Sequence, residues 1–165
     1  MKKGLIIGGI VLGVLLFLTV IIILLVLLLL PRIKEKKIEN ITHLYLTYTN
    51  GYSAYAYSIY TLDCTDKCIL KVKPQGVPDE EIIEVEIPKE KVEEIANKLN
   101  EYHVSRWNGF SKSDKYVLDG DSFSFNLDYN DNDKISAHGY MMWPNNYSDV
   151  KSYLVNTFNE YIKEK

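Results

Sequence analysis

The most prominent feature of the hydrophobic pattern is an apolar run over residues 4–30, in which Thr19 is the single polar side chain. A helix rises about 1.5 Å per residue, so this run reaches roughly 40 Å, which exceeds the roughly 30 Å hydrocarbon core of a bilayer. A cleavable signal peptide has a shorter apolar region that ends in small residues. After a flank of residues 1–3, the sequence therefore predicts an uncleaved, single-pass transmembrane helix over residues 4–30.

Glycines recur four residues apart near the start of this run, at Gly4 and Gly8 and again at Gly9 and Gly13. Small residues at this spacing let two helix backbones approach each other closely in a membrane. The spacing predicts self-association through the helix, although glycine is also more frequent in membrane helices in general.

The charges that flank the run leave its orientation open. Two lysines precede it, while Arg32, Lys34, Lys36 and Lys37 follow it within residues 31–40. The surplus of positive charge after the run favours a cytoplasmic body. A short basic N-terminus before a long apolar run is, however, also typical of a signal anchor whose body lies outside. We expect residues 31–40 to form a basic juxtamembrane stalk in either case.

The body that follows, residues 41–165, begins with segments of strand-like pattern. Four apolar and β-branched segments come first, at residues 44–49, 52–62, 69–73 and 82–87. Asn50-Gly51 joins the first two and is a strong signal for a two-residue hairpin turn. Apolar and polar residues alternate over residues 123–127, and residues 134–140 return, which predicts a second hairpin.

Two segments of the body, residues 89–102 and 147–163, repeat apolar residues at helical spacing. Residues 104–120, between them, lack a clean period. The order is four strands, a helix, two strands and a helix, with short connections between strands. This order predicts a single α+β domain over residues 41–165, in which an antiparallel sheet of about six strands carries two helices on one face.

The charge balance of the body excludes one class of partner. From His43 to Lys165 we count 13 Lys and Arg against 20 Asp and Glu, a net charge of −7. An acidic surface of this kind argues against nucleic acid as a partner. Because the chain carries no phosphate-binding glycine loop and no dinucleotide fingerprint, we expect no cofactor.

The two cysteines, Cys64 and Cys68, flank a three-residue segment between two predicted strands. If this segment is a hairpin loop, the cysteines face each other at about 4.5–5.5 Å between Cα atoms, which a disulfide can bridge. Disulfides persist in oxidising compartments, so a bonded pair would favour a body outside the cell. Two free thiols in a cytosolic loop are the alternative. The histidines carry no ligand spacing to this pair, so no metal site is expected.

One set of residues invites a catalytic hypothesis. Asp119, Asp121, Ser122 and His138 lie on or near strands that we expect to pair. A hydrolase could use His138 with Asp119 or Asp121. The sequence lacks a nucleophile elbow and a glycine-rich oxyanion loop, so we expect a protein that is not an enzyme and assign no catalytic residue.

Aromatic residues point instead to a binding surface. Thirteen tyrosines and two tryptophans exceed what the core of so small a body needs. Trp107, Phe110, Tyr140 and Trp143 flank the irregular segment and the last strand, and such side chains combine a large contact area with a polar group. We expect them to bind a protein, peptide or glycan partner; simple packing at the ends of the sheet is the alternative.

Several short motifs in the second half of the body occur together: residues 107–110 (WNGF), 117–120 (VLDG), 135–140 (ISAHGY) and 143–147 (WPNNY). This pattern resembles an uncharacterised domain of small membrane-anchored proteins and lipoproteins of low-GC Gram-positive bacteria. The resemblance covers roughly residues 82–161 and implies a body outside the cell. It implies no activity. It does imply that residues of these motifs form one recurring unit, either a site or a fold signature: Trp107, Asp119, Gly120, His138, Gly139 and Pro144.

Taken together, the sequence favours a single-pass, non-catalytic domain at the cell membrane with its body outside. The hydrolase is one alternative. A cytoplasmic-facing accessory subunit of a membrane complex is the other.

Overall fold

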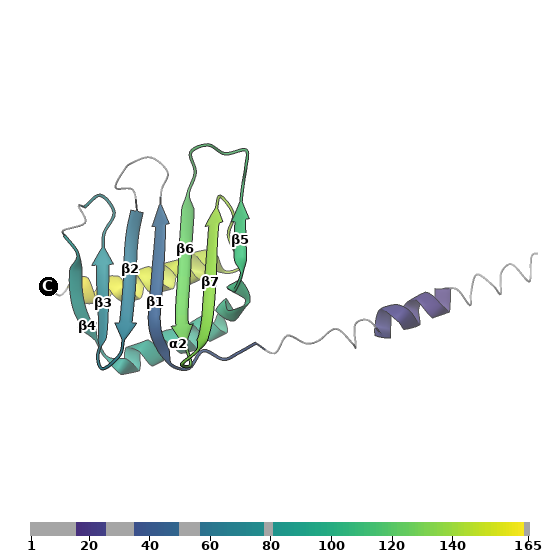
Figure 1. The fold of residues 1–165 in the computed structure, drawn as a ribbon, viewed down its shortest axis with the longest axis horizontal. Helices are drawn as coiled ribbons and strands as arrows, with labels where there is room; N and C mark the ends of the chain where they lie inside the picture. Colours follow the sequence, from purple (N-terminus) through teal and green to yellow (C-terminus); the bar gives the residue numbers. More distant parts are fainter. Residues whose placement is uncertain (1–15, 26–34, 50–56, 78–80, 164–165) are drawn as a thin grey trace, which may run out of the picture. The chain divides into compact units, whose positions relative to one another are not determined.

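The computed structural model describes residues 16–25, 35–49, 57–77 and 81–163. The chain divides into two compact units, Met1–Lys34 and Glu35–Lys165. In the first unit, the described part is a helix over residues 16–25. The second unit is the folded body (Figure 1).

The prediction of a transmembrane helix over residues 4–30 is corrected here. The described helix has ten residues, or about 15 Å at 1.5 Å per residue, which is half of what a bilayer core requires. Across the described residues, no helix is both long enough and apolar enough to cross a membrane. The four glycines predicted to mediate self-association lie outside the described residues.

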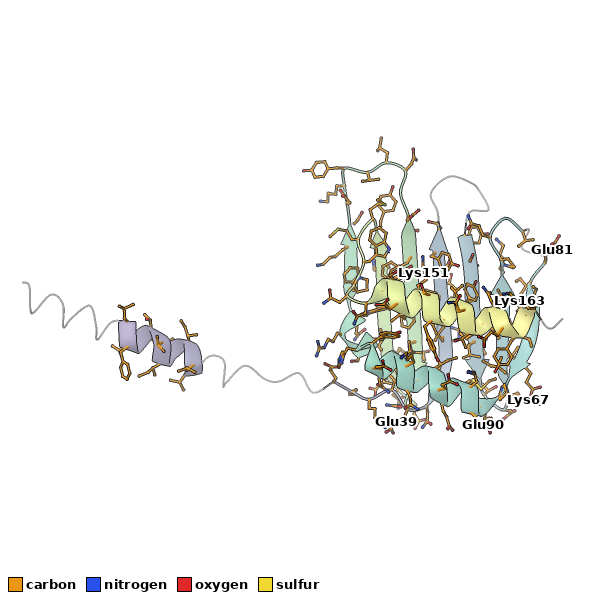
Figure 2. All side chains as sticks on the ribbon, turned by 180° about the vertical axis from the view of Figure 1, so that it is seen from behind. Glu39, Lys67, Glu81, Glu90, Lys151 and Lys163 are labelled. Atoms are coloured by element: carbon orange, nitrogen blue, oxygen red, sulfur yellow. A yellow bond between two sulfur atoms is a disulfide. The ribbon has the colours of Figure 1, made fainter. Side chains whose placement is uncertain are left out.

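The described part of the body forms one seven-stranded sheet with two α-helices and a short 3-10 helix. The strands are β1 (Ile41–Thr49), β2 (Tyr57–Cys64), β3 (Cys68–Lys73), β4 (Ile83–Ile87), β5 (Phe110–Ser113), β6 (Ser122–Tyr129) and β7 (Asp133–Tyr140). The helices are α2 (Lys89–Glu101), η1 (Val104–Trp107) and α3 (Tyr147–Ile162). The strand order is β4-β3-β2-β1-β6-β7-β5, and both α-helices cover the same face of the sheet (Figures 1 and 2).

The α+β class is confirmed, but the predicted sheet is wrong in two respects. It has a seventh described strand, β5, and it is mixed, because β5 pairs in parallel with β7 from Phe110 beside Ala137 onward. Sequence periodicity misses β5 because its four residues, FSKS, are too few to show a repeat. The predicted Asn50-Gly51 turn lies outside the described residues.

Alternation along the strands explains why one face of the sheet is buried. Every second residue of the central strands points at α2 and α3, which supply their own apolar stripes. Fully buried side chains from both layers form the core: Leu44, Leu46, Leu62, Leu70, Phe123, Phe125 and Leu127 from strands, and Ile95, Leu99, Leu154 and Phe158 from helices. The core therefore lies between the sheet and the two helices.

The described part of the expected stalk, residues 35–40, packs against the body. Ile38 is only 1% exposed and belongs to the core. Asn100 on α2 accepts a hydrogen bond from the Ile38 amide at 2.8 Å and donates one to the Ile38 carbonyl at 2.7 Å. Asn130 likewise accepts the amides of Glu39 and Asn40, each at 3.1 Å. The compact unit accordingly begins at Glu35, ahead of the boundary expected at residue 41.

Replacing Asn100 tests this attachment. We expect Asn100→Ala to lower the free energy of unfolding by about 1–3 kcal/mol, because both polar backbone groups of the buried Ile38 lose their partner. Chemical denaturation measures the change. Asn97→Ala, on the exposed side of the same helix, is the matched control and should leave stability nearly unchanged. Equal effects of the two variants would contradict the role of Asn100.

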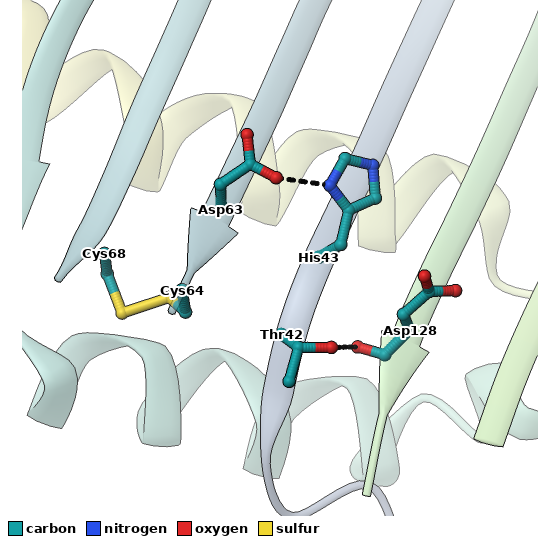
Figure 3. The surroundings of a disulfide bond; sticks show 6 residues. All are labelled: Thr42, His43, Asp63, Cys64, Cys68 and Asp128. Carbon is teal, nitrogen blue, oxygen red and sulfur yellow. Dashed lines mark hydrogen bonds and ion pairs between the residues drawn. A yellow bond between two sulfur atoms is a disulfide. The ribbon is translucent and has the colours of Figure 1, made fainter. Parts of the chain in front are cut away.

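The predicted pairing of the cysteines is confirmed. Cys64 and Cys68 are register partners at the ends of β2 and β3. A disulfide joins them, with 4.1 Å between their Cα atoms (Figure 3). The bond closes the β2–β3 hairpin, and the Cys68 side chain is part of the buried core.

Opening this bond should destabilise the body. Closing a loop of this length removes chain entropy from the unfolded state worth about 2 kcal/mol. We expect reductant to lower the free energy of unfolding by about that amount, measured by denaturation with and without dithiothreitol. A variant with both Cys64→Ser and Cys68→Ser should have the lower stability and no response to reductant. Loss of stability in that variant upon adding reductant would show that the effect does not come from the disulfide.

Candidate functional site

The connection between β7 and α3, residues 141–146, carries the most exposed tryptophan of the described residues, Trp143, at 42% exposure. The loop is held from several sides. The Trp107 indole Nε1 donates to the Asn145 carbonyl at 2.9 Å, and the Asn146 side chain donates to the Tyr102 carbonyl at 3.2 Å. Asn146 itself has φ +62°, a left-handed conformation that asparagine tolerates better than most residues.

Two glycines explain how this loop can close over the sheet. A Cβ atom on Gly139 would collide with the Met142 carbonyl, and one on Gly120 would collide with the Met141 side chain. Both glycines belong to the motifs that suggested a recurring unit. Gly139 lets the chain turn tightly before Trp143, and Gly120 on the β5–β6 connection leaves room for the Met141 side chain. Trp143 then stacks on Tyr147 at 6.4 Å between ring centroids.

Two cavities of about 480 Å³ each lie beside this loop and share Trp143, Pro144 and Asn146 as wall residues. Their volumes fall within the range of small-molecule sites, about 300–1,000 Å³. The basic cavity is lined by Tyr102, His103, Arg106, Trp107, Phe110, Lys112 and Asn145 in addition to the shared residues. The tyrosine cavity is lined by Tyr48, Thr49, Asp121, Ser122, Tyr147, Ser148, Asp149 and Lys151 in addition to them.

The basic cavity combines two cationic side chains, Arg106 and Lys112, with the His103 imidazole and aromatic walls. His103 and Arg106 come from the turn around η1, and Lys112 comes from β5, where its ammonium lies 5.4 Å from the centroid of the Phe110 ring. No Asp or Glu is among the described residues that line this cavity. The arrangement suits an anionic group placed beside an apolar one.

Glu35 does not line the basic cavity, but its carboxylate contacts two residues that do, Arg106 and His103. The Arg106 guanidinium donates to Glu35 Oε1 through both Nε and Nη2. His103 Nδ1 lies 2.9 Å from Oε2, and the Ser105 hydroxyl is 3.4 Å from the same oxygen. Hydrogen bonds from His103 and then Arg106 hold the pKa of Glu35 below its ordinary value of 4.5, because they favour the charged carboxylate.

The tyrosine cavity has a different character. The Lys151 ammonium lies over the rings of Tyr48 and Tyr147, at 4.9 Å and 5.9 Å from their centroids. Burial raises the pKa of the Tyr147 hydroxyl well above its usual value, so this group stays protonated into the alkaline range. Asp121 and Asp149 add two carboxylates to the wall.

Three of the four aromatic residues expected to bind a partner are brought together. Trp107, Phe110 and Trp143 line the basic cavity, although Trp107 is 2% exposed and packs edge-on against Phe125. Tyr140 lies elsewhere, with its hydroxyl donating to the Leu118 carbonyl at 2.8 Å. Sequence reasoning missed Arg106 and its contacts. The only available signal was an arginine directly beside Trp107 in a body otherwise poor in arginine.

The hypothetical hydrolase residues are brought together only in part, because Ser122 and His138 line one cavity while Asp119 and Asp121 do not line it. His138 lies exposed on β7, and its Nε2 is 2.7 Å from the Ser111 hydroxyl in a separate cavity of about 330 Å³. Among the described residues that line that cavity there is no Asp or Glu, whereas Asp121 lines the tyrosine cavity. Asp119 is exposed in the β5–β6 connection. A catalytic histidine needs an orienting partner, which these carboxylates do not supply here.

A second histidine on the open face of the sheet does contact a carboxylate. His43 Nδ1 lies 2.6 Å from Asp63 on the neighbouring strand (Figure 3). Within the residues that the structure describes, no group of three or more His, Cys, Asp or Glu side chains is placed to hold a metal ion. His43 and Asp63 form a cross-strand contact between β1 and β2.

No family model matches the chain, and no curated protein is significantly similar to it. The resemblance of its motifs to the domain of small membrane-anchored proteins therefore stays a prediction.

The ion pair of Glu35 should be visible in the pH dependence of stability. Since the pKa of Glu35 is lowered by folding, its carboxylate stabilises the fold fully above the unfolded pKa of about 4.5, and this contribution is lost as the pH falls through the folded pKa. We expect Glu35→Gln to be less stable than the wild type at neutral pH, and the difference to shrink below about pH 4.5.

Denaturation curves across the acid range measure this difference. Glu39→Gln is the matched control, because its carboxylate contacts the exposed Lys37 at 3.3 Å and lies on the same segment. A stability difference between wild type and Glu35→Gln that stays constant across the acid range would contradict the ion pair.

Proposed function

We propose that the protein is a membrane-associated, non-catalytic binding protein of the cell envelope, and that the cavities beside Trp143 take a protein, peptide or glycan partner. The long apolar run of residues 4–30 supports the membrane association. The Cys64–Cys68 disulfide supports a body in an oxidising compartment, outside the cytoplasm.

The observation that carries this proposal is the setting of Trp143. Trp143 is 42% exposed, yet its ring stacks on Tyr147 and its loop is fixed by hydrogen bonds to Trp107 and Tyr102. A rigid aromatic side chain loses little conformational entropy on binding, and such residues carry much of the affinity of binding surfaces. Because Trp143 forms a wall of both cavities, one ligand could contact either side of it.

The orientation of the body is tested independently of its ligand. Under this proposal, impermeant thiol reagents label Cys64 and Cys68 on intact cells only after reduction. Free thiols that react only after the cells are opened would favour the alternative, a cytoplasmic-facing subunit of a membrane complex.

Substitution of Trp143 tests the binding surface. We expect Trp143→Ala to weaken binding to ligands found on glycan and peptide arrays at least tenfold, roughly the loss caused by removing a strong aromatic contact. Tyr116→Ala is the matched control, because Tyr116 is 97% exposed and lines neither cavity. Binding that survives Trp143→Ala but is lost with Tyr116→Ala would move the surface to the β5–β6 connection.

A further inference from the structure

We propose that the basic cavity binds the carboxylate of an acidic peptide, and that Glu35 is the chain's own competitor for the same cationic groups. This inference rests on the proposed function, since it names the ligand class of one of the two cavities beside Trp143.

The charge distribution is the first argument. The body from His43 to Lys165 has a net charge of −7, yet His103, Arg106 and Lys112 converge on one cavity. Lys112 has no ion pair among the described residues, and its ammonium lies near the Phe110 ring. Arg106 and Lys112 bring two fixed positive charges to a cavity that has no Asp or Glu among its described lining residues, so the cavity favours an anionic occupant.

The contacts of Glu35 are the second argument. Each of its carboxylate oxygens is already held, Oε1 by Arg106 and Oε2 by His103 and Ser105. Arg106, His103 and Ser105 therefore already bind a carboxylate in this structure. The hydrogen bonds from Arg106 are charge-assisted, and the planar guanidinium of arginine is well suited to carboxylates. The carboxylate bound there belongs to a peptide segment without helix or strand structure, residues 35–40. Another acidic peptide can present the same group, while Trp143 and Phe110 offer apolar contact beside it.

Competition follows from the exposure of this ion pair. The side chains of Glu35 and Arg106 are 30% and 66% exposed, so their attraction is screened by water and can be replaced by a ligand that adds contacts to the aromatic walls. Ile38 stays bound to Asn100 and buried in the core, so displacement of Glu35 frees the start of the segment without unfolding the body. Ligand binding is thereby coupled to the first residues of the compact unit.

The test uses the full chain and two synthetic peptides, acetyl-Phe-Glu-Glu-amide and the same peptide with glutamine in place of both glutamates. Tryptophan fluorescence or NMR titration reports binding. We expect the acidic peptide to bind at least about tenfold more tightly than the glutamine peptide. Glu35→Gln should tighten binding of the acidic peptide by about threefold to tenfold, because it removes the competing charge. Glu39→Gln, on the same segment, should leave it unchanged.

Removing a cation should have the opposite effect. Lys112→Gln, at an exposed position of the edge strand β5, and Arg106→Gln should each weaken binding of the acidic peptide and leave the glutamine peptide unaffected. Circular dichroism checks that both variants fold. If Arg106→Gln does not fold, the binding measured for Lys112→Gln alone decides whether the inference holds.

Three outcomes would overturn the inference: equal binding of the two peptides, no tightening with Glu35→Gln, or displacement of the acidic peptide by an equal concentration of inorganic phosphate, which would indicate an unselective anion site. The proposed function is judged separately. A ligand from the arrays that depends on Trp143 but not on Lys112 would preserve the proposed function while this inference fails.

Discussion

Burial of one face of the sheet under α2 and α3 is the constraint on which the other features depend. Alternate residues of the central strands point at these two helices, and no helix among the described residues of the body covers the opposite face (Figure 1). The basic cavity forms where the connection into α3 meets the end of α2. The tyrosine cavity lies where the start of α3 meets the end of β1 and the start of β6.

Hydrogen bonds to irregular backbone decide where the body begins and how its site is shaped. Asn100 and Asn130 bind the backbone of residues 37–40, and Trp107 binds the backbone of the Trp143 loop. Buried polar backbone groups need such partners wherever no strand or helix supplies them. The described part of the expected juxtamembrane stalk, residues 35–40, is for this reason part of the body. Glu35 is thereby brought to Arg106 across 71 residues of sequence.

Local sequence patterns predicted the regular elements well. The two helices were expected over residues 89–102 and 147–163 and are found at Lys89–Glu101 and Tyr147–Ile162. The hairpin of β6 and β7 and the cysteine pairing were also anticipated, because period-two alternation and a three-residue loop are local signals. The strand β5 and its parallel pairing with β7 were not predicted. The residues of β7 that pair with β5 follow more than 20 residues later, and the four residues of β5 are too few to show a period.

By itself, the sequence determined the α+β class and the two amphipathic helices, and it placed Cys64 and Cys68 at the spacing of a hairpin pair, because each depends on residue type and short spacing. Tertiary structure alone decided which aromatic residues share a cavity, that His138 stands apart from Asp121, and that His103, Arg106 and Lys112 face one space with Glu35 at its edge. These relations depend on strand order and on contacts between distant segments. No local pattern records them, because they arise only when the two helices close over one face of the sheet.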